Sequence, residues 1–211
     1  MTANTPCQRL YLVTPAVSDP ARFAGELEPA LGAGDIAAIL LCLADDGERA
    51  LIERTKHIAS VVQGREVALL LDNRPEIVAR AGADGAHLSG VEKFSAAVTL
   101  LKPERIAGAG GLRSRHDAML AGETGADYVM FGEPDRHGRR PNFEDLQERL
   151  TWWVELFEIP CVAYAGGRDE VAPLSRTGAD FLALGDWIWS APEGAAKAIA
   201  AAAACLDEAV T

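Results

Sequence analysis

The tripeptide Gly-Ala-Asp occurs three times in this chain, each time directly before a short apolar run. The copies stand at residues 82–84, 125–127 and 178–180. A glycine can end a helix in the left-handed conformation, after which the next residues turn the chain into a buried strand. Because each copy also follows a helix-like segment, the three copies predict three helix-to-strand turns of an α/β protein.

The same alternation of strand-like and helix-like segments extends along the whole chain. The predicted strands are apolar over nearly their full length, which is typical of strands with both faces buried. They cover residues 9–14, 36–43, 67–72, 85–88, 105–110, 128–132, 160–166 and 181–185. The predicted helices cover residues 19–32, 46–63, 75–81, 92–101, 114–124, 142–157, 168–177 and 192–209.

Eight strand–helix units within 211 residues predict an α/β fold of the (β/α)8 TIM barrel class. No Pro-, Gly- or Ser-rich linker and no block of charge divides the chain, so we expect a single domain over residues 1–211. A doubly wound open sheet is the alternative, but it more often has a Gly-x-Gly-x-x-Gly turn after its first strand. The turn found here, VTPAVSDP at 13–20, contains no glycine.

The composition limits the kinds of partner that this chain could bind. The 20 Lys and Arg residues against 31 Asp and Glu residues give a formal net charge of −11, which repels nucleic acid and anionic lipid. The longest apolar run, residues 36–44, is shorter than the ~20 residues of a membrane-spanning helix. The N-terminus has no signal-peptide pattern. We therefore expect a cytoplasmic protein that binds neither nucleic acid nor a membrane.

The four cysteines are far apart in the sequence and form no Cys-x-x-Cys pair. They are Cys7, Cys42, Cys161 and Cys205. Cys42 and Cys161 lie inside apolar runs, which favours buried thiols in a reducing compartment over metal ligation.

The ends of the seventh and eighth strands carry the features of a phosphate site. Barrels often bind phosphate at this place, on backbone N–H groups and the N-terminus of a short helix. Gly166, Gly167 and Gly185 follow these strands and would let the backbone approach an anion without a Cβ in the way. Asp186, the next residue, completes the candidate phosphate-binding set. The alternative is that the glycines only make tight turns.

Oxygen-bearing side chains end the neighbouring third and fourth strands. Asp72 and Asn73 end the third strand, and Glu92 lies just beyond the fourth. Mg²⁺ usually takes one or two carboxylates together with waters and substrate phosphate, so these three residues form a candidate magnesium site. The alternative is that Asp72 caps a helix and that Glu92 is a solvated acid in a first helical turn.

Three arginines are candidates for contact with phosphate oxygens. Arg74 follows the third strand, and Arg139 and Arg140 lie in the long polar loop at residues 132–140. A loop of this kind could close over a ligand and bring guanidinium groups onto its phosphate. The alternative is a solvated surface loop.

Three further residues at strand ends form a candidate substrate pocket. They are His87, Gly110 and Trp187, which end or follow the fourth, fifth and eighth strands. A histidine inside a strand is also commonly a hydrogen-bonded core imidazole. Packing of helices on the barrel would equally explain the tryptophan.

Four segments together resemble the thiamine phosphate synthase family and its relatives, the TenI-type thiazole tautomerases. The segments are LYLVT (10–14), NRPEIVARAGADGAHL (73–88), GADYVMFGEP (125–134) and IPCVAYAGG (159–167). The resemblance spans about residues 9–191 and implies the barrel fold, a phosphorylated small-molecule ligand and a homo-oligomer. In the synthase, a pyrimidine pyrophosphate is joined to a thiazole phosphate while pyrophosphate leaves on Mg²⁺ and basic residues. The resemblance therefore implies catalytic roles for Arg74, Arg139 and Arg140.

The chain departs from the family pattern at several of these positions. The second-strand signature Gln-x-Arg-x-Lys is replaced by Leu40, Cys42 and Ala44, and the serine of the eighth strand by Asp186. The proton-shuttling histidine of the tautomerases has no counterpart near Gly111. We therefore expect a divergent thiamine phosphate synthase with slow turnover. The alternatives are a TenI-like isomerase or another enzyme acting on a small molecule, and a non-catalytic paralogue that binds a phosphorylated ligand.

Overall fold

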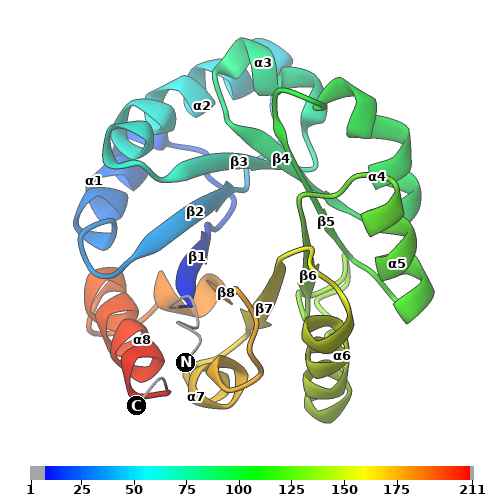
Figure 1. Cartoon of the computed structure of the whole chain (residues 1–211). Coiled ribbons are helices and arrows are strands. Elements are labelled where there is room, and N and C mark those ends of the chain that lie inside the picture. The colour runs from blue at the N-terminus through cyan, green and yellow to red at the C-terminus, as the bar shows by residue number, and fades with distance from the viewer. Residues whose placement is uncertain (1–7, 210–211) are drawn as a thin grey trace.

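The computed structural model describes residues 8–209, which form eight parallel strands closed into a barrel and surrounded by helices (Figure 1). The strands are β1 (Arg9–Val13), β2 (Ile36–Leu41), β3 (Ala68–Asp72), β4 (Gly85–Ser89), β5 (Ile106–Gly110), β6 (Tyr128–Phe131), β7 (Cys161–Ala165) and β8 (Phe181–Leu184). The helices are α1 (Pro20–Ala30), α2 (Glu48–Val62), α3 (Val78–Ala81), α4 (Val91–Ala97), α5 (Arg115–Glu123), α6 (Phe143–Leu156), α7 (Arg168–Ser175) and α8 (Ala195–Ala209). The 3-10 turns are η1 (Gln63–Arg65), η2 (Pro75–Ile77), η3 (Val98–Leu100) and η4 (Asp186–Ile188). The predicted (β/α)8 TIM barrel is confirmed.

Two of the predicted helices are less regular than expected. Residues 75–81 form the turn η2 followed by the four-residue helix α3. Pro75 starts this segment and Gly82 ends it in the left-handed conformation at φ 72°, so little room is left for regular helix. Residues 92–101 likewise divide between α4 and η3.

The barrel has two apolar layers because alternate residues of each strand point to opposite faces. On β1, Leu10 and Leu12 pack outward with helix residues such as Leu27, whereas Tyr11 and Val13 point into the barrel. The interior cluster consists of Tyr11, Val13, Ala38, Leu40, Leu70, Tyr128, Met130, Val162, Tyr164 and Ala183. Burial of both faces explains why the strand sequences are almost continuously apolar.

The Gly-Ala-Asp repeat builds the rim at the N-terminal ends of the strands. The three glycines have positive φ angles of 72°, 104° and 82°, and the three alanines are buried. Each aspartate accepts a hydrogen bond from a backbone N–H near the start of the preceding strand. The three bonds are Leu69 to Asp84 (2.8 Å), Ala107 to Asp127 (2.7 Å) and Cys161 to Asp180 (2.8 Å). In such barrels this rim serves stability, while function lies at the opposite one.

The described cysteines carry free thiols. They are Cys42, Cys161 and Cys205, and the prediction for Cys7 lies outside the described residues. Cys161 is buried as expected, and burial raises its thiol pKa to about 12. In residues 8–209, no helix has both the length and the apolar character needed to cross a membrane.

Candidate functional site

The C-terminal ends of the eight parallel strands meet at one rim of the barrel, and the predicted site residues lie there except for His87, which lies at the middle of β4. Grouped by strand, they are Asp72, Asn73 and Arg74 at β3, His87 and Glu92 at β4, Gly110 at β5, Arg139 and Arg140 after β6, Gly166 and Gly167 after β7, and Gly185, Asp186 and Trp187 after β8. The groups predicted at separate strand ends therefore lie at the same end of the barrel. The contacts of each side chain determine what it can do.

A chain of buried polar groups crosses the barrel interior below this rim. The hydroxyl oxygens of Tyr11 and Tyr128 are 2.9 Å apart, and Tyr128 Oη lies 3.0 Å from Nδ1 of His87. The other ring nitrogen of His87, Nε2, lies 3.9 Å from Oε1 of Glu133. His87 is therefore a hydrogen-bonded core imidazole on one side, and it presents its second nitrogen to a carboxyl group at the rim.

Glu133 is a functional candidate that the sequence patterns did not single out. Its side chain is 14% exposed and accepts a hydrogen bond from the Gly111 N–H. Burial raises the pKa of Glu133 to about 7, and burial lowers the pKa of His87 to about 4. Near pH 6 both groups are therefore uncharged, so their contact is not an ion pair. A carboxyl group with this pKa can take up or release a proton near neutral pH.

Gly110 gives this pair its space. A Cβ at Gly110 would lie 2.1 Å from Glu133 Oε1 and 2.3 Å from His87 Nε2, so any larger residue would force the two side chains to shift. One sequence signal could have identified Glu133: an ionisable residue directly follows the buried run Tyr128–Phe131 and its glycine. The absence of a side chain at Gly110 thus leaves room for the side chains of His87 and Glu133.

Arg140 is held by four hydrogen bonds at the end of the loop 132–140. Its Nε donates to the Gly132 carbonyl (2.7 Å), and its Nη2 donates to the Tyr164 carbonyl (3.0 Å). Nη1 and Nη2 each donate to one oxygen of the Glu170 carboxylate, both at 2.8 Å. Arg140 therefore joins the loop to β7 and α7. The carboxylate compensates its charge and occupies one N–H of Nη1 and one of Nη2.

The glycines of the predicted phosphate site already make contacts within the protein. The Gly166 N–H donates to Oε2 of Glu170 (2.7 Å), and the Gly185 N–H donates to the last carbonyl of β7 (3.3 Å). Gly167 is the N-cap of α7 in an extended conformation, and Asp186 is exposed at the start of η4. Phosphate binding at these residues stays a prediction, and at Gly166 it would require displacement of a carboxylate.

The other two candidate arginines are paired only with surface acids. Nη2 of Arg74 donates to Asp45 (2.6 Å), whose side chain is 94% exposed. Arg139 pairs with Asp135 of the same loop (2.9 Å), and the Arg139 side chain is 76% exposed. Ion pairs this exposed contribute little free energy. Both guanidinium groups could therefore turn to a ligand at small cost.

Some oxygen atoms of the candidate magnesium residues already accept hydrogen bonds within the protein. Asn73 donates from Nδ2 to Asp72 (2.7 Å), and its Oδ1 accepts from the Ser89 N–H (3.0 Å). Burial raises the pKa of Asp72, and Glu92 is exposed in the first turn of α4. Asp72 and Glu92 thus keep carboxylate oxygens for an ion, and Asn73 Oδ1 keeps the lone pair that Ser89 does not use. No three His, Cys, Asp or Glu side chains are gathered for a metal within residues 8–209.

Two tryptophans after β8 form hydrogen bonds with carbonyl groups at the ends of other strands. Nε1 of Trp187 donates to the Ala165 carbonyl (3.1 Å), and Nε1 of Trp189 donates to the Val13 carbonyl (2.7 Å). Trp189 also packs on Phe23, with ring centroids 4.9 Å apart. These bonds account for both residues structurally, and contact of Trp187 with a ligand stays a prediction.

Comparisons with known proteins identify the family and the fold of this chain. The family model described as thiamine monophosphate synthase matches residues 10–188. The chain belongs to this family. The thiamine-phosphate synthase of Rhodospirillum centenum is 43% identical over 91% of this chain and 94% of its own length. That of Hyphomonas neptunium is 37% identical over 93% of this chain and 92% of its own.

A solved structure supports the same fold. The thiamine phosphate pyrophosphorylase from Pyrococcus furiosus superposes with a TM-score of 0.79, covering 98% of this chain and 99% of its own, at 24% sequence identity. The 3-hexulose-6-phosphate synthase from Salmonella typhimurium superposes with a TM-score of 0.71 at 16% identity. At this level of identity the likeness concerns the barrel alone.

In this member of the thiamine monophosphate synthase family, the rim carries carboxyl groups beside its arginines. Leu40 is buried inside the barrel, and the half-buried Cys42 thiol has its pKa raised by burial and then by Asp72 and Asp186. Asp72 ends β3 and Asp186 begins η4, both at this rim. Together with Glu133, they give the mouth of the barrel three carboxyl groups.

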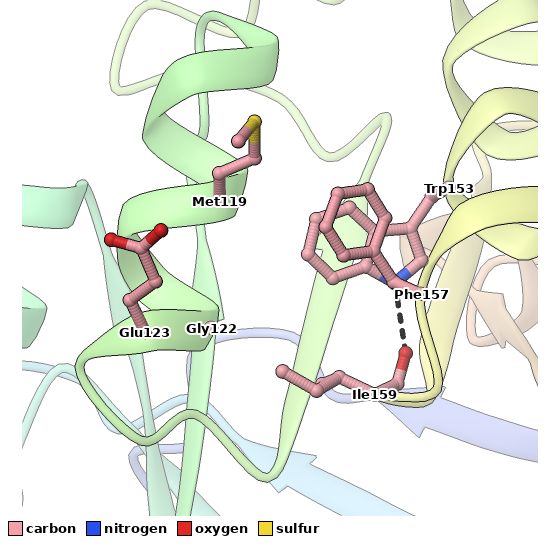
Figure 2. Close-up of a pocket in the computed structure, with 6 residues that line it drawn as sticks. All are labelled: Met119, Gly122, Glu123, Trp153, Phe157 and Ile159. Atoms are coloured by element: carbon pink, nitrogen blue, oxygen red, sulfur yellow. Dashed lines mark hydrogen bonds between the residues drawn. The ribbon is translucent and has the colours of Figure 1, made fainter.

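Two surface hollows of this family member lie between α5 and α6. One is lined by Arg115, Asp145, Glu148 and Arg149. The other measures about 270 Å³ and is lined by Met119, Gly122, Glu123, Trp153, Phe157 and Ile159 (Figure 2). In it, the Trp153 and Phe157 rings stack with centroids 4.2 Å apart, and Trp153 Nε1 donates to the Ile159 carbonyl (2.8 Å). This second hollow is a mostly apolar gap between two helices, and Glu123 is the one ionisable residue among those that line it.

Proposed function

We propose that this protein is a divergent thiamine-phosphate synthase that joins a pyrimidine pyrophosphate to a thiazole phosphate at the C-terminal rim. The observation that supports this most directly is family membership, with relatives of that name at 43% and 37% identity over nearly the whole chain. Arg74 and Arg139, each paired with one acid (Asp45 and Asp135), are the cations that would stabilise the charge of the departing pyrophosphate.

Mg²⁺ is the proposed cofactor of this reaction. Asp72 and Glu92 would hold the ion, which would neutralise phosphate oxygens when bound. The protein's own contribution is to orient the first of these carboxylates. Asn73 fixes Asp72 through its amide nitrogen, and the backbone of Ser89 fixes Asn73 through its amide oxygen.

We propose that turnover is slow. The Arg and Lys places of the family's second strand hold Cys42 and Ala44 here, and Glu170 compensates Arg140. Removal of one preorganised donor commonly lowers the rate ~10²–10³-fold. The loss of two cations should therefore leave only weak catalysis.

The test supplies purified protein with pyrimidine pyrophosphate, thiazole phosphate and Mg²⁺, and measures thiamine phosphate formation together with calorimetric binding of each substrate. We expect turnover well below the roughly 1 s⁻¹ of an ordinary enzyme, with measurable binding of thiazole phosphate. Turnover at ~1 s⁻¹ or faster would contradict the proposal that the two missing cations limit the rate. Binding without turnover would point to a non-catalytic paralogue that binds a phosphorylated ligand. The absence of both would reject the proposed function.

A second candidate is a TenI-like isomerase or another enzyme acting on a small molecule. The contact of Glu133 with His87 favours it, because the pKa of Glu133 at about 7 suits proton transfer at neutral pH. Such an enzyme would catalyse exchange of a substrate C–H hydrogen with solvent deuterium, which proton NMR measures. Exchange that persists unchanged in Glu133→Gln would remove this candidate.

We also propose that the protein binds a phosphorylated small molecule. We further propose that it is cytoplasmic and that it forms a homo-oligomer. The free thiols support a reducing compartment. Exposed apolar side chains on α5 and α6 support self-association; they are Met119, Leu120, Val154 and Leu156. Light scattering during size-exclusion chromatography measures the oligomeric state, and a mass of one chain at micromolar concentration would contradict this proposal.

A further inference from the structure

The carboxylate of Glu170 makes the contacts that an anionic ligand would make at this corner of the rim. Glu170 lies in the first turn of α7 and accepts three hydrogen bonds. Two come from the guanidinium group of Arg140 at 2.8 Å, and one comes from the Gly166 N–H at 2.7 Å. A guanidinium fork and a glycine amide are donors that protein phosphate sites commonly use. The side chains of Arg140 and Glu170 are only 23% and 20% exposed, so little water screens the pair.

The donors around this carboxylate do not depend on it for their position. Nε and Nη2 of Arg140 also donate to the carbonyls of Gly132 and Tyr164, and the guanidinium lies 5.3 Å from the centroid of the Tyr164 ring. A Cβ at Gly166 would come within 2.0 Å of Nη1, so the guanidinium packs directly against this glycine. If Glu170 left, Arg140 would keep its bonds to the carbonyls of Gly132 and Tyr164 and its place against Gly166.

Glu170 stays ionised at neutral pH. Its burial opposes ionisation, but the bonds from Arg140 and the Gly166 amide outweigh burial and lower the pKa of Glu170. A phosphate could not share the site with this carboxylate, because like charges within ~4–6 Å repel each other. One anion must therefore replace the other.

We propose that Glu170 is a specificity-determining residue that occupies the phosphate subsite in the free protein, and that the phosphate of a ligand binds by displacing it from Arg140 and Gly166. This inference rests on the proposed function, because it assumes that a phosphorylated ligand binds at this rim. Arg140 then exchanges one anionic partner for another. The affinity for phosphate is reduced by the cost of breaking the bonds of Glu170.

The test measures the affinity of inorganic phosphate by calorimetry for the wild type, Glu170→Gln and Glu144→Gln. Glu170→Gln keeps the side-chain shape and removes the competing charge, so we expect about ten-fold tighter phosphate binding. Glu144 is exposed at the start of α6 and makes no part of the site. Its replacement changes the net charge equally and should alter the affinity by less than about two-fold.

A second measurement does not depend on whether a variant folds. Phosphate titration of the ¹⁵N-labelled wild type should shift the Gly166 amide resonance in step with binding. Equal phosphate affinity of wild type and Glu170→Gln, or binding that leaves the Gly166 resonance unmoved, would overturn the role of Glu170 while phosphate binding itself stands. If neither protein binds phosphate or thiazole phosphate, the proposed phosphate ligand and this inference are both wrong.

Discussion

At the scale of single residues, the rim contains two ionisable groups whose burial shifts their pKa in opposite directions. Glu133 has its pKa raised to about 7, and His87 has its pKa lowered to about 4. Each shift favours the uncharged form, which avoids the cost of holding a charge in a poorly solvated place. Gly110 lets the two groups meet without a Cβ between them. The result is a buried pair of groups that are both uncharged near pH 6.

Replacement of Glu133 with Gln should change how stability depends on pH. Between its ordinary pKa of 4.5 and its folded pKa of about 7, the folded protein keeps a proton that the unfolded chain releases. The contribution of Glu133 to stability is therefore fully present below pH 4.5 and is lost as the pH rises through about 7. Relative to wild type, Glu133→Gln should gain on the order of 2 kcal/mol between about pH 5 and about pH 8.

Urea unfolding at several pH values measures this difference. Glu144→Gln, at an exposed position, is the matched control and should follow the wild type at every pH. The buried His87 affects wild type and variant alike, because its lowered pKa makes stability fall as the pH drops from its ordinary 6.5 to about 4. A difference between wild type and Glu133→Gln that does not change with pH would contradict the raised pKa.

At the scale of secondary-structure elements, the helix-to-strand turns do two separate tasks. The glycine of each Gly-Ala-Asp copy takes a positive φ and ends the helical segment before it. The aspartate then reaches the preceding strand and accepts a hydrogen bond from its backbone, as Asp180 does from Cys161 at 2.8 Å. Each copy thereby joins two neighbouring strands at the N-terminal rim, in addition to their own ladder of hydrogen bonds.

Replacement of Asp180 with Ala should destabilise the protein by about 1–3 kcal/mol, because it leaves the Cys161 N–H without its acceptor. Thermal or urea unfolding measures the loss. Asp180→Asn keeps an oxygen that can accept this bond, so it should cost clearly less than Ala. Equal destabilisation by Ala and Asn would show that the charge of Asp180, rather than the hydrogen bond, matters.

At the scale of the whole molecule, the barrel closes where its first and last strands meet. β1 pairs with β8 in parallel, and α8 packs beside α1 (Figure 1). The bond from Nε1 of Trp189 to the Val13 carbonyl joins residues 176 positions apart in the sequence. Closure leaves no edge strand with unpaired backbone groups, which removes a site for aggregation.

Replacement of Trp189 with Phe should weaken this closure by about 1 kcal/mol. Phe keeps an aromatic ring against Phe23 but cannot donate to the Val13 carbonyl. Differential scanning calorimetry should show a lower melting temperature with a single transition. A second, earlier transition would instead show that the β1–β8 junction opens independently of the rest of the barrel.

The sequence by itself determined the order of the elements and the closed barrel. Burial on both faces required strands such as Ile36–Leu41 to be apolar throughout, and the Gly-Ala-Asp turns marked where helices ended. Both signals are local, because they depend on residues close together in the chain. The parallel order then placed the predicted site residues at one rim without any knowledge of side-chain contacts.

Only the tertiary structure decided which side chains at that rim meet. Arg140 and Glu170 are 30 positions apart, and neither residue type marks the other as its partner. The contact of His87 with Glu133 depends on the stagger of β4, β5 and β6 and on the bare Cα of Gly110 between them. Such contacts follow from where strands far apart in the sequence end relative to one another. Local sequence patterns do not predict the distances between such side chains, because closure of the barrel sets those distances.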